Sequence, residues 1–123
     1  MKLRSSGEDY LEAILILQKE KGAVRAVDVA HYLDVTRPSV SHAVAVLQEG
    51  GFLTTDQHRL LQLTEAGAEI AEATYEKHKF FTELLVSAGV DIKTAEHDAC
   101  RMEHAISETS FHCLKKSIGK FWE

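Results

Sequence analysis

Three residues near the C-terminal end of the chain, Cys100, Glu103 and His104, have side chains that bind divalent metal ions. Residues three and four positions apart lie on the same face of an α-helix, so a helix here places a thiolate, a carboxylate and an imidazole together. These groups are ordinary ligands of manganese, iron, cobalt and zinc. The spacing therefore predicts part of a transition-metal site.

Three further candidate ligands lie earlier in the chain. Asp9 and Glu12 also have a three-residue spacing, and His78 lies in a separate helical segment between the two groups. Each residue taken alone is more often a surface or core residue than a ligand. Together the six predict a site closed across three helices. Carboxylates with imidazole favour Mn²⁺ or Fe²⁺, a thiolate shifts the preference toward iron, cobalt or zinc, and we expect one or two ions per protomer.

The helices that position these residues follow from apolar spacing and capping signals. Apolar residues recur at three- and four-residue steps from Ser5 or Ser6 to Lys21, which predicts a first helix with Asp9 and Glu12 on the face opposite its apolar side. The same signals predict helices over residues 26–33, 37–49, 64–87 and 91–105, and a sixth that starts at Ser107. For the long helix the predicted buried residues are Ile70, Ala73, Phe81, Leu84 and Leu85.

Residues 26–47 have the pattern of a helix-turn-helix. The turn at Asp34 and Val35 leads to Thr36, a typical N-cap residue, and Pro38 falls in the first turn of the next helix, where a missing N–H is harmless. Two short strands are predicted over residues 52–55 and 60–63, joined by the polar residues 56–59. This order of elements predicts a mainly α fold that contains a winged helix-turn-helix.

The second helix of this motif carries small polar side chains at its N-terminal end, and an arginine lies at the wing tip. Helix N-termini favour phosphate, and small side chains let a helix approach the base edges in the major groove. The alternative is that these residues only cap and solvate a surface helix. The candidate DNA-binding residues are Thr36, Arg37, Ser39, Ser41, His42 and Arg59.

Charge and composition restrict the function classes. The chain has 14 Lys and Arg against 19 Asp and Glu, a net charge of −5, which is unusual for a nucleic-acid binder. We therefore expect modest DNA affinity per protomer, and a homodimer that reads two half-sites of a palindromic operator. There is no apolar run near the length of a membrane span and no signal-peptide pattern, so we expect a cytoplasmic protein without membrane contact. Zinc-protease, phosphate-loop and dinucleotide motifs are also missing, which argues against an enzyme.

Five stretches of the chain, in order and spacing, resemble the diphtheria-toxin-repressor family of metal-dependent regulators. The resemblance implies a winged-helix DNA-binding domain over residues 1–72 and a helical metal-binding and dimerisation domain over residues 73–123, with metal bound between them. It also implies repression of manganese or iron uptake genes, with the metal as corepressor. The matching stretches are residues 8–12, 28–47, 63–67, 77–79 and 99–104.

The chain mixes features of two branches of that family. By resemblance, the manganese branch has a glutamate where this chain has Cys100, and the iron branch has a methionine where this chain has Asp9. By the same resemblance, the iron branch has a second, ancillary metal site. In this chain Thr82 and Glu96 occupy two of the positions where that site has its ligands, so the ancillary site is not expected here. No appended barrel domain is expected, so the layout is closest to the short manganese transport regulators.

Two alternatives remain open from the residues. Glu96, His97 and Asp98 fit a second ion site and a solvent-facing surface equally well. The same fold also suits a redox-responsive regulator in which Cys100 and Cys113 sense an oxidant.

Overall fold

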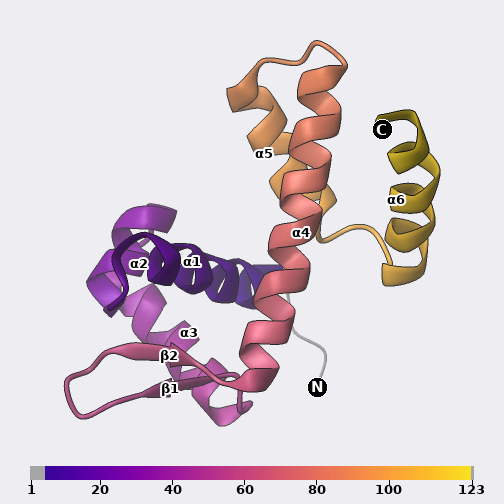
Figure 1. The fold of residues 1–123 in the computed structure, drawn as a ribbon. Helices are drawn as coiled ribbons and strands as arrows, with labels where there is room; N and C mark the ends of the chain where they lie inside the picture. The colour runs from indigo at the N-terminus through magenta and orange to yellow at the C-terminus, as the bar shows by residue number, and fades with distance from the viewer. Residues whose placement is uncertain (1–4, 123) are drawn as a thin grey trace. The chain divides into compact units, whose positions relative to one another are not determined.

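The computed structural model describes the backbone of residues 5–122 and the side chains of residues 6–118, and it is mainly helical as predicted (Figure 1). The chain divides into two compact units, Met1–Ala73 and Thr74–Glu123, and the division falls within one helix. Within the described residues, no helix combines the length and the apolar character needed to cross a membrane. The elements, in chain order, are α1 (Ser5–Lys21), α2 (Ala26–Leu33), α3 (Arg37–Glu49), β1 (Leu53–Thr55), β2 (Leu61–Leu63), α4 (Glu65–Ser87), α5 (Ile92–Met102) and α6 (Glu108–Trp122).

The first unit has an apolar core to which all its elements up to β1 contribute. The bounds of α1, α2 and α3 agree with the sequence prediction. The large side chains that are fully buried come from each of these helices, from the loop after α1 and from β1. Detaching any of these elements would therefore expose apolar surface to water. They are Leu11, Ile14, Val24, Val29, Val40, Leu47 and Leu53.

Local hydrogen bonds explain the turn of the helix-turn-helix. Asp34 ends α2 in the left-handed conformation, with φ of 55°, and the Val35 N–H donates to the Ala30 carbonyl over 3.0 Å. Thr36 then caps α3, because its Oγ1 accepts from the Ser39 N–H over 3.2 Å. The predicted cap and turn are therefore confirmed.

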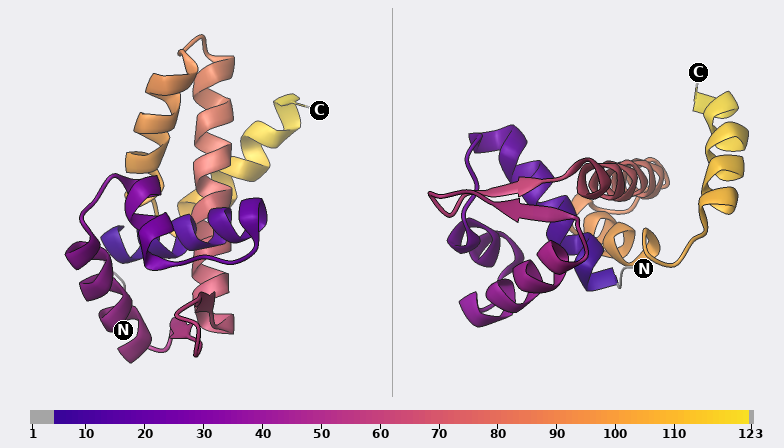
Figure 2. Two further views of the ribbon diagram at one scale, coloured as in Figure 1. Left: turned by 90° about the vertical axis from the view of Figure 1, so that its left-hand side faces the viewer. Right: turned by 90° about the horizontal axis from the view of Figure 1, so that it is seen from below.

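The wing is a short antiparallel hairpin, with Leu53 opposite Leu63 and Thr55 opposite Leu61, and its two strands lie side by side in the right-hand view of Figure 2. Each strand starts one residue later than predicted. Phe52 is lost from β1 because its N–H donates to the Leu47 carbonyl at the end of α3, and Leu60 is lost from β2 because its N–H donates to the side chain of Asp56.

Asp56 organises the wing tip. Its Oδ1 accepts from the N–H groups of His58, at 2.8 Å, and Leu60, at 2.9 Å. The hydrogen bond from Leu60 is the largest influence that holds the pKa of Asp56 below its usual value. Arg59 lies between these two residues in the left-handed conformation, with φ of 63°. The backbone of the tip is therefore held by one carboxylate.

Asp28 anchors the start of α2, and replacing it gives a prediction for stability against pH. Its carboxylate accepts from Lys21 Nζ over 2.7 Å and from the Arg25 N–H over 2.8 Å, and these bonds hold its pKa below the ordinary 3.8. A depressed pKa means that the stabilisation is present above the ordinary value and is lost as the pH falls through the folded-state pKa. We expect Asp28→Asn to cost about 1 kcal/mol at neutral pH, and we expect this cost to diminish as the pH falls below 3.8 and through the lower folded-state pKa.

Urea unfolding across this pH range measures the effect, with Glu20→Gln on the exposed end of α1 as the matched control. A cost of Asp28→Asn that stayed constant down to pH 2 would mean that the carboxylate charge is not what stabilises α2.

The second unit is centred on aromatic residues of α4 and α6. Phe80 lies edge-on to both Phe81 and Phe111, with ring centroids 5.3 Å apart in each case, and Ala99 of α5 completes the cluster. Ser107 starts α6 by accepting the Ser110 N–H, as the predicted start requires. The aromatic cluster therefore ties the three helices of this unit together.

Two predictions for this part of the chain were wrong in detail. On α4, Phe81 is buried as expected, but the other four predicted core residues are only half-buried, and the chain instead buries Ala71, Thr74, Lys77 and Phe80. A single apolar stripe is a poor guide here because α4 contributes to two units and two of its buried residues are polar. The fifth helix ends at Met102 rather than Ala105, and residues 103–105 form a turn.

Candidate metal centre and nucleic-acid interface

The end of α5 positions Cys100 and Glu103. Asp91 starts the helix by accepting the Thr94 N–H over 3.1 Å, and hydrogen bonds from Thr94 lower the pKa of Asp91. Although α5 ends at Met102, the Glu103 N–H still donates to the Ala99 carbonyl over 2.9 Å. Glu103 therefore keeps helical geometry, and its side chain follows that of Cys100 by one helical turn.

The Glu103 carboxylate lies between two imidazoles. Its Oε2 is 3.1 Å from Nδ1 of His78 on α4, and its Oε1 is 3.3 Å from Nε2 of His104. The Glu103 side chain is completely buried, and the two histidine side chains are 23% and 12% exposed, respectively. A buried carboxylate is costly unless it has charged or hydrogen-bonding partners, so these contacts stabilise it.

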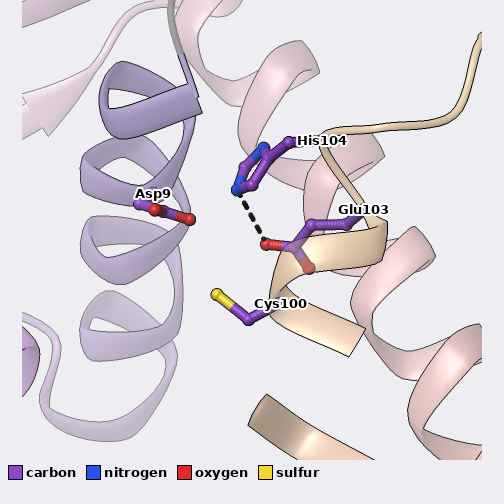
Figure 3. Close-up of side chains that lie close together, drawn as sticks. All are labelled: Asp9, Cys100, Glu103 and His104. Carbon is purple, nitrogen blue, oxygen red and sulfur yellow. Dashed lines mark ion pairs between the residues drawn. The ribbon is translucent and has the colours of Figure 1, made fainter. Parts of the chain in front are cut away.

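Cys100 adds a sulfur atom to the same cluster (Figure 3). Potential ligand atoms of Cys100, Glu103 and His104 lie within 4.8 Å of one another. Metal–ligand bonds of about 2.0–2.3 Å place the donors of a single ion within roughly 4.6 Å of one another. One sulfur, one carboxylate and imidazole nitrogen at these separations therefore fit a divalent transition ion after small movements of the side chains.

The predicted ligands Asp9 and Glu12 lie one turn apart on α1, in the first unit, and Figure 3 also draws Asp9 extending from that helix. Asp9 is half-buried and Glu12 is only 8% exposed. Every residue from 11 to 15 is buried, so this stretch of α1 has no solvated face.

The two cysteines differ in their surroundings. Neither forms a disulfide, and Cys100 is half-buried whereas Cys113, on α6, is exposed. Among the residues whose side chains are described, Cys113 is not part of the cluster formed by Cys100, Glu103 and His104.

The six candidate DNA-binding residues are all exposed. The Thr36 hydroxyl has a structural role, because it caps α3 and also donates to Ser39 Oγ over 2.9 Å. Arg37, Ser41 and His42 lie on the first two turns of α3, around the buried Val40. The exposed N-terminal half of α3 and the wing tip therefore present polar and cationic groups to solvent.

Sequence reasoning missed two residues next to the metal-ligand candidates. Lys77 is 8% exposed, which is rare for a lysine, and it forms an ion pair with Glu108 in the first turn of α6. No periodic apolar pattern marks a buried lysine. The only signal was its position directly before His78.

Comparison with known proteins agrees with this arrangement. Residues 2–61 match the iron-dependent repressor N-terminal DNA-binding domain, and residues 64–123 match the iron-dependent repressor metal-binding and dimerisation domain. The chain is 34% identical over 118 residues to the HTH-type transcriptional regulator MntR of Bacillus subtilis, covering 96% of this chain and 83% of the relative. It is 33% identical over 102 residues to the diphtheria toxin repressor of Corynebacterium diphtheriae, covering 82% of this chain and 45% of the relative.

Among solved structures, that of IdeR from T. acidophilum has a similar fold, with a TM-score of 0.77 and 25% sequence identity. The match covers 97% of this chain and 55% of that one, so the chain spans about half the length of this neighbour. The two family matches together cover almost the whole sequence, and they divide it between α1–β2 and α4–α6. The chain therefore belongs to the iron-dependent repressor family of metal-dependent transcriptional regulators, the diphtheria-toxin-repressor family that its motifs resemble.

Proposed function

We propose that this protein represses manganese or iron uptake genes and that Mn²⁺ or Fe²⁺, one or two ions per protomer, is its corepressor. The observation that carries the proposal is the buried Glu103 carboxylate between His78 and His104, with Cys100 beside it. A site of this composition, in a chain that also contains a winged helix-turn-helix, supports metal control of DNA binding.

In this proposal Asp9 and Glu12 complete the ligand set. Their one-turn spacing presents two carboxylates together, and the burial of Glu12 is typical of a carboxylate with a specific partner. Bound metal supplies the positive charge that offsets the carboxylates. Ligands on α1 and on the α4–α5 segment would then hold the helix-turn-helix in one position relative to the second unit, which limits the positions of α3 in the dimer.

The size of the response to metal follows from the coupling between the metal site and the DNA-binding surface. A coupling free energy of about 1–3 kcal/mol between these two sites makes DNA binding roughly 5- to 150-fold tighter. In a homodimer two copies of α3 would read the two half-sites of a palindromic operator, so each correctly placed helix would contribute to the free energy of DNA binding. We assign residues 1–72 to DNA binding and residues 73–123 to metal binding and dimerisation, in a cytoplasmic protein.

Selection of genomic DNA fragments by the purified protein, without oxygen and in parallel with Mn²⁺, Fe²⁺ and a chelator, tests the proposal. Enrichment that requires one of the metals would identify the corepressor and its operator. Equal enrichment under all three conditions would contradict metal control while leaving the winged-helix assignment intact. A Cys113→Ser protein in the same selection separates metal control from a two-cysteine switch.

The proposed contact of Arg59 with the DNA backbone gives a quantitative prediction. Arg59 is exposed at the wing tip, and a contact between a cation and a phosphate carries no sequence information. We expect Arg59→Ala to weaken binding to all sequences alike and to lower the slope of log affinity against log salt by about 1 per protomer. Fluorescence anisotropy at several salt concentrations measures this slope.

Lys93→Ala, on the exposed side of α5, serves as the control of equal charge change. An Arg59→Ala protein with an unchanged salt slope and an altered base preference would show that the wing reads bases instead.

A further inference from the structure

A buried lysine that pairs with an exposed glutamate lies next to the candidate metal centre. Lys77 is 8% exposed, its Nζ forms an ion pair with the Glu108 carboxylate, and the same Nζ lies 6.0 Å from the centroid of the Phe111 ring. Phe111 is itself buried in the aromatic cluster of the second unit. The lysine therefore contacts α6 through both a charge and an aromatic ring, and the proposed function uses neither contact.

Two adjacent residues of α4 hold opposite ends of one short segment. His78 contacts Glu103, at the start of residues 103–108, and Lys77 pairs with Glu108 at the end. Between them lie His104 and the α6 cap Ser107. Because only four residues separate the two contacts, a displacement at Glu108 changes the backbone path available to Glu103 and His104.

We propose that Lys77 and Glu108 are positioning residues of the metal centre. Their ion pair holds residues 103–108 against α4, so that the Glu103 and His104 donors lie close to their metal-binding positions before an ion arrives. Residues that orient metal ligands raise affinity because less order must be gained on binding. The same contact links the metal centre to the first turn of α6. This inference rests on the proposed metal site and adds two residues that are not ligands.

A second ion pair provides a matched control. Glu76 pairs with Lys115, which also joins α4 to α6, but these side chains are 49% and 52% exposed. Removing Glu76 deletes one α4–α6 ion pair and one negative charge, as removing Glu108 does. Only the removal of Glu108 also deletes the ion pair that joins residues 103–108 to α4.

The test measures Mn²⁺ affinity of the full chain by electron paramagnetic resonance of the free ion, for wild type, Glu108→Gln, Lys77→Met and Glu76→Gln. We expect Glu108→Gln and Lys77→Met to weaken Mn²⁺ binding about 10-fold, the lower end of the effect of orienting residues, and Glu76→Gln to change it less than about twofold. Lys77→Arg should retain most of the affinity. The absorption bands of the Co²⁺-loaded protein should change in the first two variants only, since they report ligand geometry rather than stability.

Each outcome decides one question. If Glu108→Gln binds Mn²⁺ as tightly as Glu76→Gln and has the wild-type Co²⁺ spectrum, the positioning role is overturned and the proposed function stands. If the wild-type protein binds none of Mn²⁺, Fe²⁺ and Co²⁺, the proposed function falls and this inference with it. Should Lys77→Met fail to fold, Glu108→Gln decides the matter, because the Glu108 side chain is 72% exposed and its loss leaves the core unchanged.

Discussion

Glu103→Gln is expected to lower Mn²⁺ affinity by about 100-fold or more and to abolish metal-stimulated DNA binding while the protein remains folded. Glutamine has nearly the shape of glutamate, but it lacks the charge and one of the oxygens that face His78 and His104. Changing a residue that only orients a ligand typically costs 10- to 100-fold in affinity, so loss of a direct ligand should cost at least about as much. Calorimetric Mn²⁺ titration and anisotropy with operator DNA measure the two effects.

The fold should survive because a neutral isostere removes a buried charge without leaving a cavity. Glu96→Gln, on the exposed side of α5, is the matched control and should behave as wild type. Normal metal-stimulated DNA binding by Glu103→Gln would count decisively against this metal centre. Normal binding by Glu103→Gln together with a lost response in Glu96→Gln would instead move the site to residues 96–98.

Gly67→Ala is expected to destabilise the protein by about 3 kcal/mol, at the upper end of the usual cost of overpacking. A Cβ atom at Gly67 would lie 1.9 Å from the Phe52 carbonyl oxygen and 2.9 Å from its carbonyl carbon. The Phe52 backbone cannot easily move away, because its N–H donates to Leu47 and its carbonyl accepts from Thr64. The midpoint and slope of urea unfolding measure the loss.

Gly51→Ala provides a comparison for backbone strain without a clash. Gly51 has a φ of +82°, but a Cβ there would have no atom within 4 Å. Its replacement should cost about 1–2 kcal/mol, the usual penalty of the left-handed conformation for other residues. If Gly67→Ala proved no more damaging than Gly51→Ala, the close approach of α4 to Phe52 would not be a constraint on the fold.

Local signals were sufficient for most of the secondary structure. The hydroxyl of Thr36 and the carboxylate of Asp91 cap their helices as their residue types predict, and Pro38 falls where its missing N–H costs nothing. The wing was also foreseen, but its strands lose one residue each. Phe52 and Leu60 hydrogen-bond to groups outside the ladder, and no strand propensity encodes those partners.

The spacing of the ligands within one helix could also be predicted from local signals. Cys100 and Glu103 lie one turn apart because helical geometry is set locally, and this survives the early end of α5. By contrast, the contact of His78 with Glu103 joins residues 25 positions apart, and it depends on how α4 packs against the end of α5. Residue types alone suggested this pairing, but only packing decides whether such groups meet.

The sequence by itself therefore determined the elements, their order and the ligand types, because capping, helical periodicity and turn chemistry act within a few residues. The tertiary structure alone decided which polar groups are buried. Lys77 and Glu12 are buried although their residue types favour solvent, since burial depends on what packs against a side chain. The approach of Gly67 to Phe52 is likewise a contact between separate elements, whose cost no local pattern records.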